Sequence, residues 1–258
     1  MKSGLCSISF RKHSVDEVIE LAKSAGIEGI EWGGDVHVPP GDLELARRVR
    51  EKTEAAGLEV CSYGSYYKCT DETEPFADVL DSARELGAPV IRLWAGAKGS
   101  AEATEDDRRD IAERLRRAVL SAAESNITVA LEYHGGTLTD TQESAHRLLQ
   151  EVGLPDLKLY WQPRTGGEFK DDIPELEAAL PVLAHVHCFH WGPGGWKDRR
   201  PLLEGTDDWK TYLEIIRQAE DERFIILEFI KDDSPEQLRE DARVLRALLA
   251  EPARPRER

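Results

Sequence analysis

Short β-rich runs alternate with helical patterns along almost the whole chain, and this alternation limits the fold more than any other feature. Eight runs follow one another at nearly regular spacing: 5–10, 26–32, 58–64, 89–96, 127–134, 157–163, 185–191 and 224–229. Strands that alternate with helices predict βα units around a parallel sheet. Eight units in 258 residues fit one closed (β/α)8 TIM barrel. We expect this domain to span residues 1–251, with a flexible tail at 252–258.

The segments between the runs carry helix signals. Ser14 is suited to an N-cap, Glu17 completes a capping box, and Gly26 is suited to end the helix. Residues 106–126 and 234–251 have apolar positions at helical spacing and charged outer faces. An open, doubly wound sheet is the alternative fold, but neither GxGxxG nor GK followed by Ser or Thr comes after the first run.

The charge balance and the cysteines limit the partners and the compartment. Acidic residues outnumber basic ones by 50 to 34, for a net charge of −16, which disfavours binding to nucleic acid or to an anionic membrane. No apolar stretch suits a signal peptide or a bilayer span, so we expect a cytoplasmic protein. The four cysteines are scattered without CxxC spacing, which indicates reduced thiols.

Ionisable side chains lie near the ends of several predicted strands. Glu132, His187 and Glu228 belong to three different strands, and the carboxyl ends of all strands in a parallel barrel surround one cavity. A charged residue inside an apolar strand such as VALEY or IILEF is costly to bury unless it is paired or lies next to a cation. A divalent metal removes that cost, so this pattern predicts a metal site.

The HVHCFHW stretch places three histidines in seven residues. Because side chains alternate along a strand, His185, His187 and Phe189 share one side. If that side faces inward, His187 lies nearer the rim and is the better ligand. His185 then lies one layer deeper, where it is either a hydrogen-bonded histidine of the core or of the ligands' surroundings, or a catalytic residue. His190 begins the loop and is a candidate for substrate contact.

These stretches together resemble the xylose-isomerase-like barrel superfamily, which includes sugar isomerases, ketose 3-epimerases, inosose dehydratases and apurinic endonucleases. The resemblance covers essentially the whole chain and rests on GIEGIEWGG, VIRLWAG, ALEYHGGTLTDT, HVH, EGTDDWKTYLEII and IILEF in that order. It implies that Glu132, Gln162, His187 and Glu228 take the places of the Glu, Asp, His and Glu metal ligands of the epimerases. The family's D-x-x-H pattern on strand six reads QPRT here, with Gln162 for the Asp and Thr165 for the His.

The Gln162 substitution affects the expected metal. Two carboxylates, one imidazole and one neutral amide just neutralise a divalent cation, so we expect weaker affinity and a more Lewis-acidic metal than in the family pattern. Oxygen-rich ligation with a single histidine favours Mn²⁺ or Mg²⁺, and Zn²⁺, Co²⁺ and Fe²⁺ are also compatible.

The resemblance implies an isomerase: a metal-dependent sugar isomerase or epimerase acting on a ketose or a related polyol or sugar, including sugar phosphates. Glu132 and Glu228 would move a proton through an enediolate. His134 and His190 are candidates for proton shuttling or hydroxyl recognition. The expected partner is a small-molecule sugar, and self-association into a homo-oligomer is common in this family.

Aromatic and cationic side chains complete the predicted substrate site. Trp94 and Trp191, with Trp32, are candidates for an apolar wall, although packing between sheet and helix explains each nearly as well. The Gly-rich loop at 192–205 is either a solvated loop or a lid, with Arg199 as the preferred cation.

Several other functions share these residues. The same metal site would serve an inosose-type dehydratase or a hydroxypyruvate isomerase, whereas the QPRT stretch favours a barrel that has lost catalysis and only binds a sugar or a protein partner. An apurinic endonuclease needs a cluster of zinc ions, more histidine and aspartate ligands and a basic surface, which a chain of net charge −16 does not offer.

Overall fold

Eight parallel strands close into a barrel in the computed structural model, which describes residues 1–70, 75–164, 169–219 and 221–252. The strands are hydrogen-bonded around the barrel in the order β1, β10, β7, β6, β5, β4, β3, β2. Their bounds are β1 (Lys2–Cys6), β2 (Gly29–Gly33), β3 (Glu59–Gly64), β4 (Val90–Leu93), β5 (Thr128–Glu132), β6 (Lys158–Trp161), β7 (Leu183–Cys188) and β10 (Phe224–Leu227). The prediction of a closed eight-stranded barrel is confirmed.

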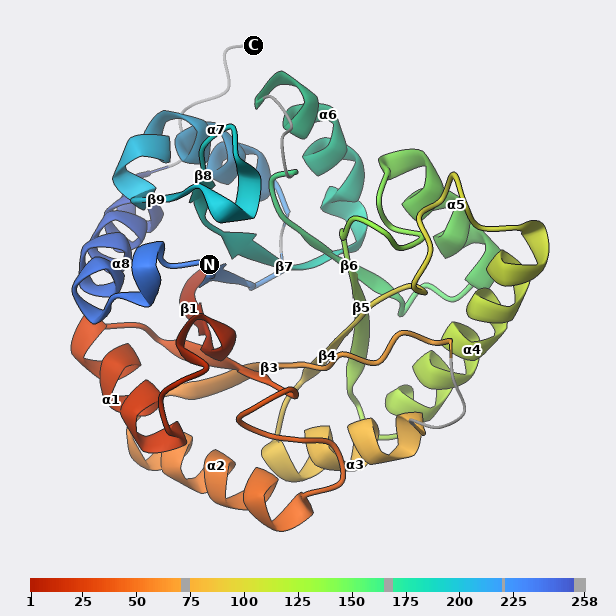
Figure 1. Ribbon diagram of the computed structural model, residues 1–258, viewed down its shortest axis with the longest axis horizontal. Helices are drawn as coiled ribbons and strands as arrows, with labels where there is room; N and C mark the ends of the chain where they lie inside the picture. Colours follow the sequence, from red (N-terminus) through yellow and green to blue (C-terminus); the bar gives the residue numbers. More distant parts are fainter. Residues whose placement is uncertain (71–74, 165–168, 220, 253–258) are drawn as a thin grey trace.

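Helices surround the barrel on the outside, as Figure 1 shows. They are α1 (Val15–Ala25), α2 (Leu43–Ala55), α3 (Phe76–Leu86), α4 (Glu105–Ala123), α5 (Gln142–Val152), α6 (Phe169–Ala179), α7 (Thr206–Ile216) and α8 (Pro235–Ala250). The predicted start and end of the first helix are observed: Ser14 and Glu17 form a capping box, and Gly26 has the left-handed φ of 71°. No helix in the described part of the chain has the length and apolar character that a membrane crossing needs.

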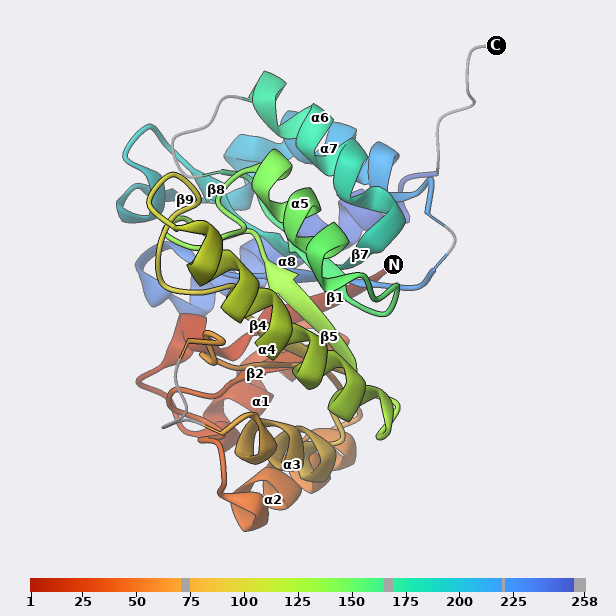
Figure 2. The same ribbon diagram turned by 90° about the vertical axis from the view of Figure 1, so that its right-hand side faces the viewer.

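A small antiparallel hairpin follows β7. It consists of β8 (His190–Trp191) and β9 (Arg199–Arg200), so the seventh predicted run is divided between the barrel and this hairpin. The side view in Figure 2 shows the hairpin on the side of the molecule opposite the N-terminus. Apart from residue 252, the predicted tail at 252–258 lies outside the described residues.

The first strand was misplaced by the sequence pattern. We expected it at 5–10, but β1 covers Lys2–Cys6 and Ser7–Phe10 form a 3-10 turn (η1). Gly4 pairs with Ile226 of β10, and a Cβ atom at Gly4 would lie only 2.9 Å from Cγ1 of Ile226. Close packing inside the barrel therefore requires a glycine at this position. Because glycine has a low propensity for strands, the sequence pattern gave no strand signal there.

The interior of the barrel changes from apolar to charged toward the carboxyl ends of the strands. Val90, Ala130 and Ile226 belong to an apolar cluster with other inward-facing residues, and all three are buried. Residues two positions further along a strand face the same side. That step leads to Arg92, Glu132 and Glu228, which are also buried. The charged layer therefore lies nearer the carboxyl ends of the strands than the apolar layer does.

His185 belongs to the deeper part of the β7 strand. One ring nitrogen, Nδ1, accepts the N–H of Phe224 at 3.3 Å, and Nε2 donates to the carbonyl of Cys61 at 3.3 Å. The ring also packs edge-to-face on Tyr160 and Phe224. This arrangement is that of a hydrogen-bonded core histidine, which was one of the two alternatives left open by the sequence.

We predict that His185 makes the fold sensitive to acid. Burial lowers the pKa of His185 to about 4, whereas an unfolded histidine titrates near 6.5. Below about pH 6.5 the unfolded chain binds a proton that the folded chain does not. The free energy of unfolding therefore decreases as the pH falls from about 6.5 to about 4, by about 3 kcal/mol in total. Urea unfolding of wild type and His185→Gln at pH 7.5 and 4.5 tests this: the difference between the two proteins must shift in favour of the variant at pH 4.5, and equal pH slopes contradict it.

Candidate active site

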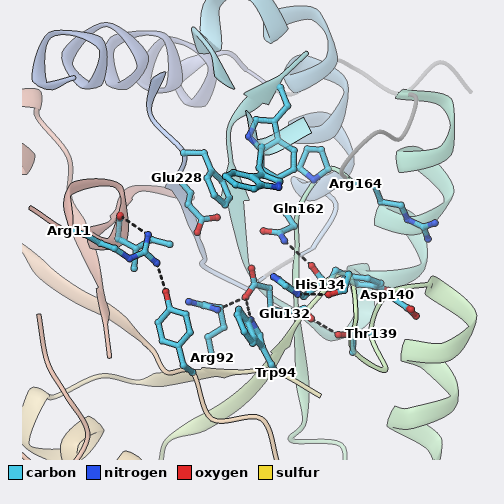
Figure 3. A pocket seen from close by; sticks show the side chains of 18 residues that line it. Arg11, Arg92, Trp94, Glu132, His134, Thr139, Asp140, Gln162, Arg164 and Glu228 are labelled. Carbon is cyan, nitrogen blue, oxygen red and sulfur yellow. Dashed lines mark hydrogen bonds and ion pairs between the residues drawn. The ribbon is translucent and has the colours of Figure 1, made fainter. Parts of the chain in front are cut away.

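A cavity of about 570 Å³ opens above the charged layer. Six of the predicted site residues line it: Trp94, Glu132, His134, Gln162, Trp191 and Glu228. Figure 3 shows Glu132, Gln162 and Glu228 approaching one another from the carboxyl ends of three different strands. A concave site with several convergent polar groups at this end of a barrel is the expected position for catalysis.

Three oxygen atoms surround one nitrogen of His187, which is fully buried. Nδ1 lies 3.0 Å from Oε1 of Gln162, 3.3 Å from Oε2 of Glu228 and 3.6 Å from Oε1 of Glu132. The structure therefore brings together the four side chains that the sequence predicted as ligands. Their metal-binding role itself stays a prediction.

Gln162 presents its oxygen to this group. Its Nε2 donates to the carbonyl of Tyr133 at 2.8 Å, and only the NH₂ end of an amide can donate to a carbonyl. Oε1 is thereby directed at Nδ1 of His187. The amide replaces the expected aspartate as an oxygen donor, but without a charge.

Glu31 holds the other side of the His187 ring. Its Oε1 lies 3.2 Å from Nε2 of His187. Glu31 also accepts from Arg92 at 3.0 Å and from the hydroxyl of Ser62 at 2.6 Å. Burial lowers the pKa of His187, but Glu228 and Glu31 outweigh burial and raise it to about 10. A carboxylate that orients a histidine in this way is typical of the surroundings of metal ligands.

Arg92 is a buried cation between two carboxylates. Its guanidinium donates to Glu31 at 3.0 Å and to Glu132, and its side chain is only 2% exposed. Trp94 donates its Nε1–H to the same Glu132 oxygen at 2.6 Å. Burial raises the pKa of Glu132, but the charge of Arg92, aided by His187, lowers it to about 2. Glu132 is therefore ionised at neutral pH, and its other oxygen faces His187.

Glu228 has an oxygen without a hydrogen bond. Oε2 is buried and has no hydrogen-bond donor among the described residues, although it lies near His187. Burial, opposed by the charge of His187, raises the pKa of Glu228 to about 7. The next residue, Phe229, has φ of 51°, a strained value for a bulky side chain. Its ring packs against Phe189 and Trp191, which stabilises the turn that follows Glu228.

The charges and donor atoms at this site fit a divalent metal ion. Glu31, Glu132 and Glu228 carry three negative charges when ionised, and Arg92 carries one positive charge. A divalent cation bound at Nδ1 would displace the proton of His187, and the remaining two negative charges would then match that cation beside a neutral imidazole. The unpartnered oxygen of Glu228 is the kind of buried polar atom that such a cation satisfies.

His134 lies beside this group at the cavity wall. Its ring stacks on Trp94 with centroids 4.3 Å apart, and Nδ1 lies 2.7 Å from the carbonyl of Gly135. Because a carbonyl can only accept, Nδ1 is the nitrogen that donates to Gly135. Nε2 is therefore the nitrogen that His134 can offer to a ligand in the cavity that it lines.

Some predicted substrate residues do not line the cavity. His190 lies in β8 opposite Arg200. Arg199 pairs with Asp233 at 2.7 Å and lies over the ring of Phe229, 5.2 Å from its centroid. The indole of Trp32 is fully buried, where it donates to Thr53. Sequence position at a strand end does not show on which side of the barrel wall a side chain lies. Thr165 is outside the described residues.

The sequence interpretation gave no role to Glu31, Arg92, Arg11 or Tyr66. Glu31 and Arg92 carry the same signal that identified Glu132, a charged residue within an apolar strand, and could have been found by it. Arg11 and Tyr66 line the cavity from loops after the first and third strands. Their positions have no periodicity, so only the tertiary structure reveals them.

Comparison with known proteins adds to this picture. A curated 3-dehydroshikimate dehydratase from Bacillus anthracis is 28% identical to this chain, over 95% of the chain and 96% of the relative. The crystal structure of the probable 3-DHS dehydratase AsbF from Bacillus anthracis matches with a TM-score of 0.80 at 26% identity, over 95% of this chain and 99% of that one.

Other similarities are more distant. The L-ribulose-5-phosphate 3-epimerase UlaE of Shigella boydii is 25% identical over 54% of this chain, and the match spans 49% of its own length. The IolI protein, whose crystal structure holds a zinc atom, shares the fold with a TM-score of 0.75 at 14% identity, over 97% of this chain and 98% of that one.

These matches correct the expected reaction class. We expected an isomerase, but the sequence relative that matches over nearly the full length is a dehydratase, which is a lyase, while the epimerase relative is less similar and matches about half of the chain. The family itself is as expected, because the model described as xylose isomerase-like TIM barrel matches residues 19–248. The chain therefore belongs to the xylose isomerase-like TIM barrel family.

Proposed function

We propose that this chain is a metal-dependent dehydratase that removes water from a β-hydroxy ketone on a polyhydroxylated ring, with 3-dehydroshikimate as the first substrate to test. The observation that carries the proposal is the approach of Glu132, Gln162 and Glu228 to Nδ1 of His187 at the edge of a cavity that His134 also lines. The full-length similarity to dehydratases favours water loss as the outcome.

Glu132, Gln162, His187 and Glu228 would hold the metal ion. Bound there, a divalent cation polarises the ketone and acidifies the adjacent C–H bond. Three oxygen donors and one nitrogen favour Mn²⁺ or Mg²⁺, and the zinc in IolI shows that this fold also accommodates Zn²⁺.

His134 is the general base in this proposal. Its Nε2 removes the proton next to the ketone, and the electron pair of that C–H bond forms a C=C bond as the hydroxyl at the next carbon departs. The imidazolium of His134 gives its proton to the departing hydroxide, so that one molecule of water leaves and the histidine is neutral again. For 3-dehydroshikimate, loss of one water and enolisation of the ketone give the aromatic 3,4-dihydroxybenzoate.

The cavity also offers hydrogen bonds to ring hydroxyls. Nε1 of Trp191 and Oδ1 of Asp140 are buried at the cavity wall, and neither has a hydrogen-bond partner within the described ranges. One is a donor and the other an acceptor, which together suit the hydroxyl groups of a polyol. Trp94 offers less, because its Nε1–H is already donated to Glu132.

A direct assay tests the proposal. Wild type loaded with Mn²⁺ should convert 3-dehydroshikimate into 3,4-dihydroxybenzoate, seen as new ultraviolet absorbance, and a chelator should abolish the reaction. His134→Gln should lower kcat by about 10²–10⁴ while metal content, measured by mass spectrometry, stays stoichiometric. Stoichiometric metal without turnover of 3-dehydroshikimate or of an inosose contradicts the proposal and favours a barrel that only binds its ligand.

A further inference from the structure

The cavity has a cationic group on the side of β1. Arg11 follows the η1 turn directly after β1 and lines the cavity together with Tyr66, which follows β3. Figure 3 shows the guanidinium of Arg11 on the opposite side of the cavity from Arg164, with Glu228 and Glu132 between them. The polar partners of Arg11 and Tyr66 are Asp35, the carbonyl of Ile8 and each other, not the four predicted metal ligands.

Arg11 retains hydrogen-bond donors that its neighbours do not use. Nε donates to Asp35 at 2.6 Å, one terminal nitrogen donates to the carbonyl of Ile8 at 3.2 Å, and the other donates to the hydroxyl of Tyr66 at 2.6 Å. A guanidinium has five N–H groups. One N–H on each terminal nitrogen therefore has no acceptor in the described part of the molecule.

Tyr66 adds a third donor beside them. Burial raises the pKa of its phenol, so the hydroxyl stays protonated at neutral pH. Its oxygen accepts from Arg11, which leaves its own O–H available to donate. The ring packs edge-to-face on Trp94, with centroids 5.3 Å apart, and Trp94 donates to Glu132. A single aromatic side chain thus separates this donor pair from the predicted metal group.

The other two arginines that line the cavity, Arg92 and Arg164, form ion pairs with buried glutamates. Arg164 pairs with Glu175, a carboxylate that is 1% exposed and depends on this partner, and Figure 3 shows its guanidinium pointing away from Glu132 and Glu228. Arg92 is held between Glu31 and Glu132. Arg11 is thus the arginine of this cavity wall that retains donors for a ligand without leaving a buried carboxylate unpaired, since the side chain of its partner Asp35 is 25% exposed.

We propose that Arg11 and Tyr66 bind a carboxylate of the substrate, so that this chain acts on a hydroxylated cyclic keto acid rather than on a neutral ring ketone such as an inosose. The inference rests on the proposed dehydratase function and selects between its two substrate classes. Two guanidinium N–H groups and a phenol O–H match the acceptor oxygens of one carboxylate. Held there, the acid group fixes the ring at one edge, while its ketone and hydroxyls extend toward Glu132, Glu228 and His134.

Binding of two nearly identical probes tests this assignment. The full chain loaded with Mn²⁺ is titrated calorimetrically with 3,4-dihydroxybenzoate and with 3,4-dihydroxybenzamide, which keeps the shape and loses the charge. Wild type should bind the acid at least about tenfold more tightly. Arg11→Gln should weaken binding of the acid by about 10–100-fold and leave the amide unchanged, and Arg11→Lys should lie between.

Two further variants make the result specific. Tyr66→Phe, which retains the ring on Trp94, should lose about fivefold in affinity for the acid alone. Arg47→Gln removes a half-exposed arginine that pairs through Nε with Glu85 on the outside of the barrel, as Arg11 pairs with Asp35, and it should bind both probes like wild type. With 3-dehydroshikimate, Arg11→Gln should raise KM and lower kcat/KM by about 10–100-fold, in line with the weaker binding of the acid.

Equal affinity of wild type for the acid and the amide, or an Arg11→Gln variant that binds the acid as wild type does, overturns the inference. Failure of the proposed function gives a different result. In that case wild type turns over neither 3-dehydroshikimate nor an inosose, while the binding comparison still reports on the carboxylate.

Discussion

Replacing Glu228 with glutamine is expected to remove the metal and the activity while leaving the fold intact. Oε2 of Glu228 has no hydrogen-bond donor in the residues described, and burial raises the pKa of this carboxyl to about 7, so the neutral amide avoids the cost of a buried charge and gives up only the charge interaction with His187 at 3.3 Å. The cation, in contrast, loses one of its two carboxylate ligands. We expect bound metal after dialysis to fall below about a tenth of the wild-type content, and kcat/KM for water loss to fall by about 10³, equivalent to about 4 kcal/mol.

Metal analysis and thermal unfolding of the same preparation measure both parts of this prediction. Glu175→Gln is a matched control, because Glu175 is also a buried glutamate with one unpartnered oxygen and a pKa raised by burial, but it pairs with Arg164 away from the metal group. Its metal content should equal that of wild type. A Glu228→Gln protein that keeps stoichiometric metal and full turnover would show that Glu228 is not a ligand.

Replacing Arg92 with methionine should cause the largest loss of stability. The guanidinium is 2% exposed and neutralises Glu31 and Glu132, whose side chains are 0% and 5% exposed. Removing it leaves two buried carboxylates without their cation, which costs about 3–5 kcal/mol in the free energy of unfolding. For a chain of this size the melting temperature should fall by about 10 °C.

Urea unfolding in the presence of a chelator measures this loss without a contribution from bound metal. Arg47→Met removes an exposed ion pair with Glu85 and should cost less than about 1 kcal/mol. Arg92→Lys keeps the positive charge but lacks the planar guanidinium that reaches both carboxylates. The stability of Arg92→Lys should therefore lie between that of Arg92→Met and that of wild type. If Arg92→Met unfolds within 1 kcal/mol of wild type, the two glutamates are not held ionised by Arg92.

The same four donors are compatible with more than one reaction, which explains why the sequence led to the wrong reaction class. An isomerase and a dehydratase both begin by removing a proton next to a carbonyl that a metal polarises. What differs is whether a neighbouring hydroxyl then departs, and this depends on how the ring is held in the cavity. Arg11 and Tyr66, which we propose to hold it, come from irregular segments where the sequence has no pattern to interpret.

The eight βα units, and the three ionisable residues in or directly after apolar strands, could be predicted from the sequence, because period-two and helical spacing are local properties of a chain. The folded structure was needed to find that Glu31 orients His187, that Arg92 holds Glu132 ionised and that Arg199 turns away to Asp233. These contacts join residues far apart in the sequence. They depend on strand register, barrel closure and the direction of individual side chains, which no local spacing records.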